Sequence, residues 1–264
     1  MKGDLRRNTK AVLGRMAGAA GLYSRRFRSQ MTIVAFHRVT SIIESDDLTC
    51  SPADFEEFCK FFAKYFRVMP LARQIDACSK GEDLGGTLSI TFDDGYSDNL
   101  VVAAPILQKL NLPATFFVTS GFIDSKIVAP WDERLMGKTE WMTWSQVRAL
   151  RDMGFDIGSH THTHIDMGTA EPSVVRAELA ISKEKLLSEL GVDTRLFAYP
   201  FGGREHISEF SRDLVREAGF TCCLSCYGGV NSPRPDPFLL KRIGIAEWFA
   251  RPDQHGFELL TGRV

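Results

Sequence analysis

The sequence predicts a single-domain α/β protein in which parallel strands and helices form a distorted barrel. Apolar runs of strand length alternate with amphipathic helical patterns from residue 32 to residue 245, and such alternation implies parallel strand pairing. No internal repeat or domain linker interrupts the pattern. With 264 residues, of which 44% are hydrophobic, the chain is long enough for one barrel and a large core.

The first half of the chain contains four expected strands, each rich in β-branched or aromatic residues. They lie at 32–36, 67–69, 87–92 and 114–118. A helix is expected to begin at Ser51, with Pro52 at its first position. Two further helices are expected at 71–79 and 99–110.

Residues 120–143 form the longest irregular stretch, and Trp131 and Trp141 lie in it, with Trp144 just beyond. An exposed tryptophan on such a loop would stack on a sugar ring, although large aromatic residues also fill gaps in a core. We expect Trp131 rather than Trp144 to line a cleft.

The second half of the chain continues the alternation. Thr143 caps a helix that runs to Met153, where Gly154 stops it before a strand at 155–157. The remaining expected elements are helix 171–190, strand 195–199, helix 207–218, and strands 220–225 and 239–245.

Two polar clusters follow strand patterns and form the candidate site. The first contains Asp93 and Asp94, and the second contains His160, His162 and His164. In an α/β protein, the carboxyl ends of parallel strands carry the ligand-binding and catalytic groups. Asp-Asp-Gly alone is typical of a surface turn. Two carboxylates on one strand end and three imidazoles on another nevertheless predict a metal site.

The histidine spacing leaves two geometries open. If residues 160–164 were extended, His160 and His164 would lie roughly 13 Å apart, too far for both to bind one ion. In a helical turn their Cβ atoms would lie about 5 to 6 Å apart, which suits a shared ion. The segment therefore either turns and uses His160 with His164, or stays extended and uses His160 with His162. One aspartate would complete three protein ligands and leave a position open for water.

Three motifs resemble the first three signature motifs of the polysaccharide deacetylases, carbohydrate esterase family 4. They are Thr91-Phe92-Asp93-Asp94-Gly95-Tyr96, His160-Thr161-His162-Thr163-His164 and Phe197-Ala198-Tyr199-Pro200-Phe201-Gly202. Their order and spacing match, and the similarity runs from about residue 30 to residue 246. The resemblance implies a distorted (β/α)7-type barrel and metal-dependent removal of the acetyl group from N-acetylated hexosamine units of a polysaccharide or oligosaccharide.

The resemblance also implies roles for individual residues. Asp94, His160 and His164 would bind the metal, with zinc as the expected ion and cobalt or nickel as alternatives. Asp93 would act as general base, and the backbone N–H of Phe201 would donate to the oxyanion. The residues expected to contact substrate are Tyr96, Trp131, Tyr199 and Pro200.

The sequence departs from the family pattern in two places. Many members have an arginine in the third motif, where this chain has Ala198, and many have a late Leu-x-His motif, whereas residues 239–245 contain no histidine. The chain looks like the exopolysaccharide branch of the family, in which motif order is permuted and the acid comes from an early strand. We therefore expect His37 to be the general acid and Arg242 to replace the missing arginine beside Asp93.

Residues 1–30 form a basic segment ahead of the expected catalytic domain, residues 31–264. The segment has a net charge of +7, which leaves −8 on the rest of a chain whose total is −1. It is expected to form an amphipathic helix that its glycines weaken. The residues near one helical face are Leu5, Val12, Met16, Ala20, Tyr23 and Phe27. Either this segment contacts an anionic membrane surface, or it frays or packs on the body as an extra helix.

The expected location is cytoplasmic or peripheral to the inner membrane. The longest apolar stretch near the N-terminus is interrupted by Arg15, so it matches neither a secretion signal nor a membrane span. The six cysteines suggest no disulfide framework and are expected to be buried thiols in a reducing compartment. No nucleic-acid partner is expected, and the sequence does not specify an oligomeric state.

Two other functions compete with the deacetylase prediction. An amidohydrolase of the same fold would act on a small or lipid-linked substrate inside the cell. A catalytically silent homologue would only bind carbohydrate. The presence of Asp93, Asp94, His160 and His164 argues against the silent homologue, because binding alone does not require the whole set.

Overall fold

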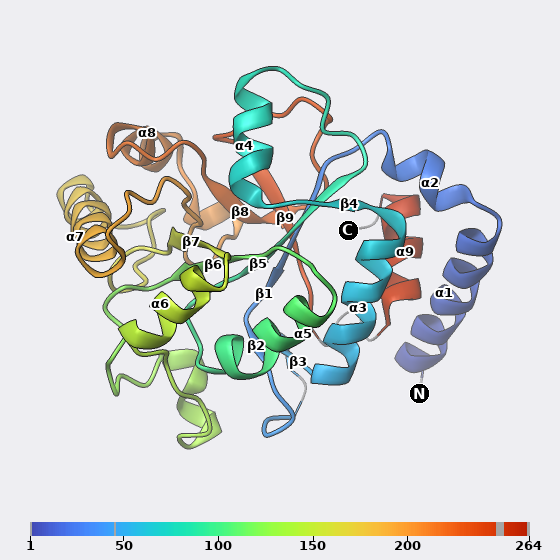
Figure 1. Cartoon of the computed structure of the whole chain (residues 1–264), viewed down its shortest axis with the longest axis horizontal. Coiled ribbons are helices and arrows are strands. Elements are labelled where there is room, and N and C mark those ends of the chain that lie inside the picture. The colour runs from blue at the N-terminus through green and yellow to red at the C-terminus, as the bar shows by residue number, and fades with distance from the viewer. Residues whose placement is uncertain (1, 45, 247–250, 263–264) are drawn as a thin grey trace.

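A computed structural model of the chain describes residues 2–44, 46–246 and 251–262, and its centre is a parallel sheet surrounded by helices (Figure 1). The strands of this sheet are β1 Thr32–Phe36, β4 Arg67–Val68, β5 Thr87–Phe92, β6 Thr115–Val118, β7 Asp156–Ser159, β8 Leu224–Gly228 and β9 Leu240–Gly244. Within the described residues their order is β7-β6-β5-β1-β9-β8, and β4 pairs with β5 outside this path.

The sheet closes into a barrel through residues 197 and 198, which form no regular strand. Phe197 pairs with Ser159 at the end of β7, and Ala198 pairs with Leu224 at the start of β8. These two bridges join the edges of the sheet, so the predicted α/β barrel is confirmed. The predicted strand 195–199 is thus reduced to single pairs on each side.

The strand sequences explain which side chains face outward and which face the barrel interior. Phe36, Phe92 and Phe116 are neighbours in the register of β1, β5 and β6, and their rings stack at centroid distances of 5.5 and 4.7 Å. This stack packs against helix α3 (Pro52–Tyr65). Because successive residues of a strand point to opposite faces, Asp93 points the other way from Phe92.

The helices that cover the barrel follow the predicted order. They are α3, α4 Leu71–Ser79, α5 Ala104–Lys109, α6 Trp144–Asp152, α7 Pro172–Leu190 and α8 Glu209–Glu217. Ser51 caps α3 by accepting the N–H of Asp54, and Thr143 forms a capping box with Gln146 at the start of α6. None of the described helices is both long and apolar enough to cross a bilayer.

Three predicted elements have different bounds in the structure. The helix expected at 99–110 begins as a π-helical turn, Asn99–Ala103, and becomes α-helical just before Pro105, which has no N–H to donate to a preceding turn. The strand expected at 220–225 begins only at Leu224, because the N–H groups of Thr221 and Cys223 donate to Arg195 and Pro237 outside the ladder. The helix expected at 207–218 begins at Glu209, after the cap Ser208.

Three helices outside the barrel lie together at one edge of the molecule. They are α1 Lys2–Ala19, α2 Leu22–Phe27 and α9 Pro252–Thr261, and Figure 1 shows α9 between α1 and α3. The sequence pattern did not predict α9. It also did not predict the short pair β2 Arg38–Val39 and β3 Thr49–Cys50, which follows β1.

Candidate metal centre and its cleft

A cleft of about 320 Å³ lies at the carboxyl ends of the strands. Its lining includes most of the residues that the sequence singled out, from five separate segments of the chain: His37, Asp93, Asp94, Trp131, His160, His164, Tyr199 and Phe201. Asp47, Leu48, Cys226, Gly244 and Ile245 complete the lining. The fold therefore brings the two predicted polar clusters into one cavity.

Asp94, His160 and His164 converge on one point. The Oδ1 atom of Asp94 lies 3.4 Å from Nε2 of His160 and 3.4 Å from Nε2 of His164. Two ligand atoms of a tetrahedral zinc site, each about 2.05 Å from the ion, are about 3.3 Å apart. All three side chains are buried, and Oδ1 of Asp94 has no hydrogen-bond partner within the described residues. The donor atoms and their spacing therefore fit a divalent metal ion.

The histidine segment turns, as one of the two predicted geometries requires, but not as a helix. Thr161 and His164 have φ values of 63° and 60°, and the N–H of His164 donates to Oγ1 of Thr161 at 3.0 Å. His162 leaves the cleft and its Nδ1 pairs with Oγ of Ser120 at 2.9 Å. The alternative that used His160 with His162 is therefore wrong.

Left-handed backbone is concentrated at this site. Besides Thr161 and His164, Asp94 has φ 74° and Phe201 has φ 60°. Such conformations cost about 1 to 3 kcal/mol each for residues other than glycine, so they persist only where the surrounding contacts hold them. Their presence on three loops around one cleft indicates that the loops are shaped for the site rather than for local stability.

Two buried contacts fix the histidine ligands. Nδ1 of His160 lies 2.9 Å from the carbonyl oxygen of Ala198, which directs Nε2 toward Asp94. Glu178 of α7 accepts the backbone N–H groups of His162 and Thr163 at 2.8 and 2.7 Å, and also the hydroxyl of Thr163. Nothing in the sequence distinguished Glu178 from the other charged residues of its helix.

Asp93 and Arg242 form a buried ion pair inside the barrel. The two terminal nitrogens of Arg242 donate to the two oxygens of Asp93 at 2.8 and 2.6 Å, and its Nε donates to the carbonyl of Ser225 at 2.7 Å. Burial acts to raise the pKa of Asp93, but Arg242, His160 and His37 hold it below its ordinary value. Asp93 is therefore ionised at neutral pH, next to Asp94.

His37 follows β1 and lies beside Asp93 in the cleft. Its Nε2 is 4.0 Å from Oδ2 of Asp93, and the ring lines the cleft. Burial lowers the pKa of His37, although Asp94 and Asp93 act in the opposite direction. Apart from the two ligands, it is the one imidazole among the described residues that line the cleft.

Trp131 forms an aromatic wall against His164, with ring centroids 4.5 Å apart. Its indole N–H donates to the hydroxyl of Tyr96 at 2.8 Å, and that hydroxyl donates to Asp132 at 2.9 Å. Arg38, fully buried, pairs with Asp132 as well. The expectation that Tyr96 contacts substrate does not fit this position, because Tyr96 is buried behind Trp131 and does not line the cleft.

The turn at residues 199–202 presents a free backbone donor. Within the described residues the N–H of Phe201 has no acceptor, while the Gly202 N–H donates to Pro200. A Cβ atom on Gly202 would lie 2.5 Å from Cβ of Cys226, so this close approach requires glycine. Tyr199 lines the cleft, whereas Pro200 is buried outside the lining, so its predicted substrate contact is not seen.

Trp144, the first residue of α6, is buried in the core and does not line the cleft. Asp47 and Leu48 were missed because they belong to the unpredicted loop between β2 and β3. Cys226 was missed because its strand was placed too early in the sequence, ending at Ser225.

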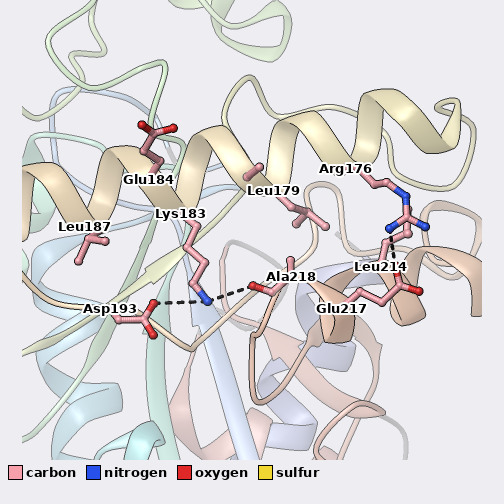
Figure 2. A pocket seen from close by; sticks show the side chains of 10 residues that line it. Arg176, Leu179, Lys183, Glu184, Leu187, Asp193, Leu214, Glu217 and Ala218 are labelled. Carbon is pink, nitrogen blue, oxygen red and sulfur yellow. Dashed lines mark hydrogen bonds and ion pairs between the residues drawn. The ribbon is translucent and has the colours of Figure 1, made fainter.

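A larger hollow of about 480 Å³ lies between α7 and α8, apart from the strand ends (Figure 2). Four of its five charged side chains are paired with one another. Lys183 contacts Asp193 at 3.4 Å and the carbonyl of Ala218 at 3.0 Å, and Arg176 pairs with Glu217. Within the described residues, the one group of side chains spaced to hold a metal ion is in the smaller cleft. That cleft is therefore the candidate site.

Comparison with known proteins agrees with this fold. YxkH of Bacillus subtilis (strain 168), named as a polysaccharide deacetylase, is 22% identical over 220 residues, which cover 83% of this chain and 72% of YxkH. The deacetylase PplD of Streptococcus pyogenes, solved in complex with acetate, superposes with a TM-score of 0.72 at 22% identity, over 86% of this chain and 96% of PplD. IcaB of Ammonifex degensii gives a TM-score of 0.72 at 20% identity, over 87% of this chain and 97% of IcaB.

The sequence model of the polysaccharide deacetylases matches residues 80–223, more than half of the chain and the part that contains Asp93, Asp94, His160 and His164. The chain belongs to the polysaccharide deacetylase family, hydrolases that act on carbon–nitrogen bonds other than peptide bonds.

Proposed function

We propose that this protein is a metal-dependent N-deacetylase that hydrolyses the acetamide of N-acetylated hexosamine units in a polysaccharide or oligosaccharide. The observation that carries the proposal is the convergence in one cleft of three metal-ligating atoms, the paired carboxylate of Asp93 and the free N–H of Phe201. Binding of a sugar alone would require none of these three to be adjacent.

Asp94, His160 and His164 would hold the ion. Zinc is the expected ion because one carboxylate and two imidazoles suit it, with cobalt or nickel as alternatives. When bound, the ion would lower the pKa of a water molecule toward about 7 and polarise the acetyl carbonyl. The protein supplies the remaining chemistry through the residues around these ligands.

Asp93 is the proposed general base. Its carboxylate is ionised at neutral pH and held in place by both terminal nitrogens of Arg242, so it accepts the proton of the attacking water without rearranging. The backbone N–H of Phe201 is the proposed oxyanion donor, and a fixed donor of this kind contributes about 3 kcal/mol.

His37 is the proposed general acid for the departing amine. Its ring lines the cleft, with Nε2 4.0 Å from the base. Its protonated form would donate to the amine, and because burial lowers the pKa of His37, that form is lost as the pH rises, which would give the basic limb of the rate profile. Trp131, Tyr199 and the exposed ring of Phe201 provide the apolar surface for the sugar.

Acetate release from chitooligosaccharides, measured with and without a chelator, tests the proposal. We expect release that the chelator abolishes and that added zinc restores. A protein that binds the oligosaccharide but releases no acetate under any metal would be the silent homologue. Release from a small or lipid-linked N-acetylated sugar, with none from oligosaccharides, would favour the related amidohydrolase. The cytoplasmic location stays a prediction, which cell fractionation would test.

A further inference from the structure

Helix α1 packs on α9 through its small residues. Ala11, Gly14 and Ala17 form the buried face, and a Cβ atom on Gly14 would lie 1.8 Å from the backbone oxygen of Asp253. The hydroxyl of Tyr23 donates to the carbonyl of Gly14 at 2.7 Å, which ties α2 to the same contact. This backbone approach fixes the rotation of α1 about its axis.

The larger apolar residues of α1 consequently face away from the protein. Val12 and Met16 are 60% and 64% exposed, and Leu13 beside them is 43% exposed. Leu22, at the start of α2, is 52% exposed. An ordinary surface helix buries such residues and exposes small or polar ones. Gly14 and Gly18 thus lie on the packing side, whereas Val12, Met16 and Ala20 of the predicted apolar face point outward.

Arginines border this apolar face on α1 and follow it in the next helix, and most of them are unpaired within the described residues. By the helical period of about 3.6 residues, Arg6 and Arg15 lie on its two borders. Arg25 and Arg26 on α2, and Arg28 just after it, are exposed. Among the described residues only Arg15 of this group forms an ion pair, with Asp253 at 3.3 Å. Residues 6–30 contain no acidic residue.

We propose that this outer face, Val12, Leu13, Met16 and Leu22 with the arginines around it, binds an anionic lipid surface. The apolar side chains would enter the boundary between headgroups and acyl chains, and the arginines would contact lipid phosphates. Figure 1 shows α1 at the edge of the molecule, with α9 between it and the barrel, so a flat surface can reach it.

The same observations disfavour other occupants. A second copy of the chain joined through this face would bring its own arginines against those of the first, because a two-fold contact pairs each patch with itself. A nucleic acid would satisfy the arginines and leave the apolar stripe in water. An anionic membrane is the one partner that matches both the charge and the apolar side chains.

Sedimentation of the full chain with phospholipid vesicles tests the inference. We expect binding to vesicles that contain phosphatidylglycerol, weaker binding at high salt, and little binding to pure phosphatidylcholine. The double change Val12→Glu and Met16→Glu should weaken binding at least about tenfold. The matched control is Val101→Glu with Met136→Glu, two apolar residues that are 61% and 90% exposed elsewhere, and it should bind like the wild type.

Three results would overturn the inference: no vesicle binding by the wild type, equal loss in the control variant, or a dimer in light scattering that Val12→Glu dissociates. Thermal unfolding checks that each variant is folded. The inference deepens the predicted membrane location and does not depend on the proposed chemistry. Acetate release from a soluble oligosaccharide without vesicles reports that chemistry separately, so either proposal can fail alone.

Discussion

The two adjacent carboxylates that follow β5, Asp93 and Asp94, have different partners. Asp93 is paired with Arg242, whereas Asp94 faces the imidazoles of His160 and His164. Burial acts to raise the pKa of each carboxylate. Their partners nevertheless hold the pKa of Asp93 below its ordinary value and the pKa of Asp94 well below its ordinary value. Both are ionised at neutral pH, so geometry alone separates their roles.

Because the two carboxylates have different partners, replacing each by asparagine should have different effects on metal binding and on the rate. Asp94→Asn should abolish stoichiometric metal binding, because it replaces a charged ligand by a neutral amide. Asp93→Asn should retain the metal and lose about 10²- to 10⁴-fold in kcat, the usual range for a general base. Metal analysis of dialysed protein and acetate release measure the two effects. Loss of metal in both variants to the same degree would contradict the assignment.

Arg242 should control the pH at which Asp93 works. Replacing Arg242 by Met leaves a buried carboxylate without its partner, so its pKa should rise toward the value that burial favours. The base is active when deprotonated, and the acidic limb of the rate profile should therefore move to higher pH. Breaking such a buried pair also destabilises the fold, by about 3 to 5 kcal/mol.

Arg242→Lys is the matched control, since it keeps the charge and loses the two parallel hydrogen bonds. Its acidic limb should lie between those of the wild type and Arg242→Met. If the limb of Arg242→Met stays in place while metal content falls, Arg242 would be a structural residue and not a partner of the base.

His37→Gln tests the proposed acid. The side chain keeps a polar terminus but cannot carry the proton, so we expect kcat to fall about 10²-fold and the basic limb of the profile to disappear. Measuring kcat as a function of pH, across both limbs, gives the fall in rate and shows whether the basic limb is lost. An unchanged basic limb with a near-normal rate would remove His37 from the mechanism.

At the scale of elements, one helix positions the loop that carries His160 and His164. Glu178 of α7 is buried and binds the backbone of residues 162 and 163, between His160 and His164. Without it these N–H groups would have no buried acceptor among the contacts described. The helix therefore maintains the left-handed turn that points both imidazoles at one place.

Glu178→Ala should lower metal affinity about 10- to 100-fold, as loss of an outer contact to a ligand does. Glu178→Gln keeps one acceptor oxygen and should recover part of this loss. Chelator competition gives the affinity, and activity at saturating metal shows whether the assembled site still works. Equal affinities for Glu178→Ala and the wild type would contradict the positioning role.

The elements also show what the sequence could predict. Strand ends followed by Asp93-Asp94 and the histidine run predicted that these side chains would meet in one place, because parallel strands bring their carboxyl ends together. The burial of Tyr96 and the choice of His164 over His162 were not predictable, since each depends on a loop that crosses from another segment. Helix α9 lacked a clear pattern because its buried face is partly polar, with Gln254, His255 and Glu258.

At the scale of the whole molecule, the N-terminal helices are joined to the C-terminal one. The periodicity of residues 1–30 showed a helix but not its packing face, because that face is defined by α9, more than two hundred residues later. Lys10 of α1 pairs with the buried Glu258 of α9 at 2.6 Å and reinforces the contact. The two ends of the chain thus close one side of the protein.

Gly14→Val should separate these helices, because a side chain there meets the backbone of Asp253. We expect the free energy of unfolding to fall by about 1 to 3 kcal/mol, the usual cost of overpacking. Ala19→Val, which adds the same side chain at an exposed position of α1, is the control. Calorimetry measures the difference, and equal stability of the two variants would show that α1 does not contribute through this contact.

The single pairs that close the barrel also join the site to the integrity of the fold. Ala198 donates its N–H to the carbonyl of Ser159, and its own carbonyl oxygen orients His160. Three residues later the chain reaches the N–H of Phe201. Binding of a metal ion by His160 should therefore stabilise the bridges at residues 197 and 198. We expect it to slow deuterium uptake at Ala198 and Tyr199, so that barrel closure and metal binding are cooperative.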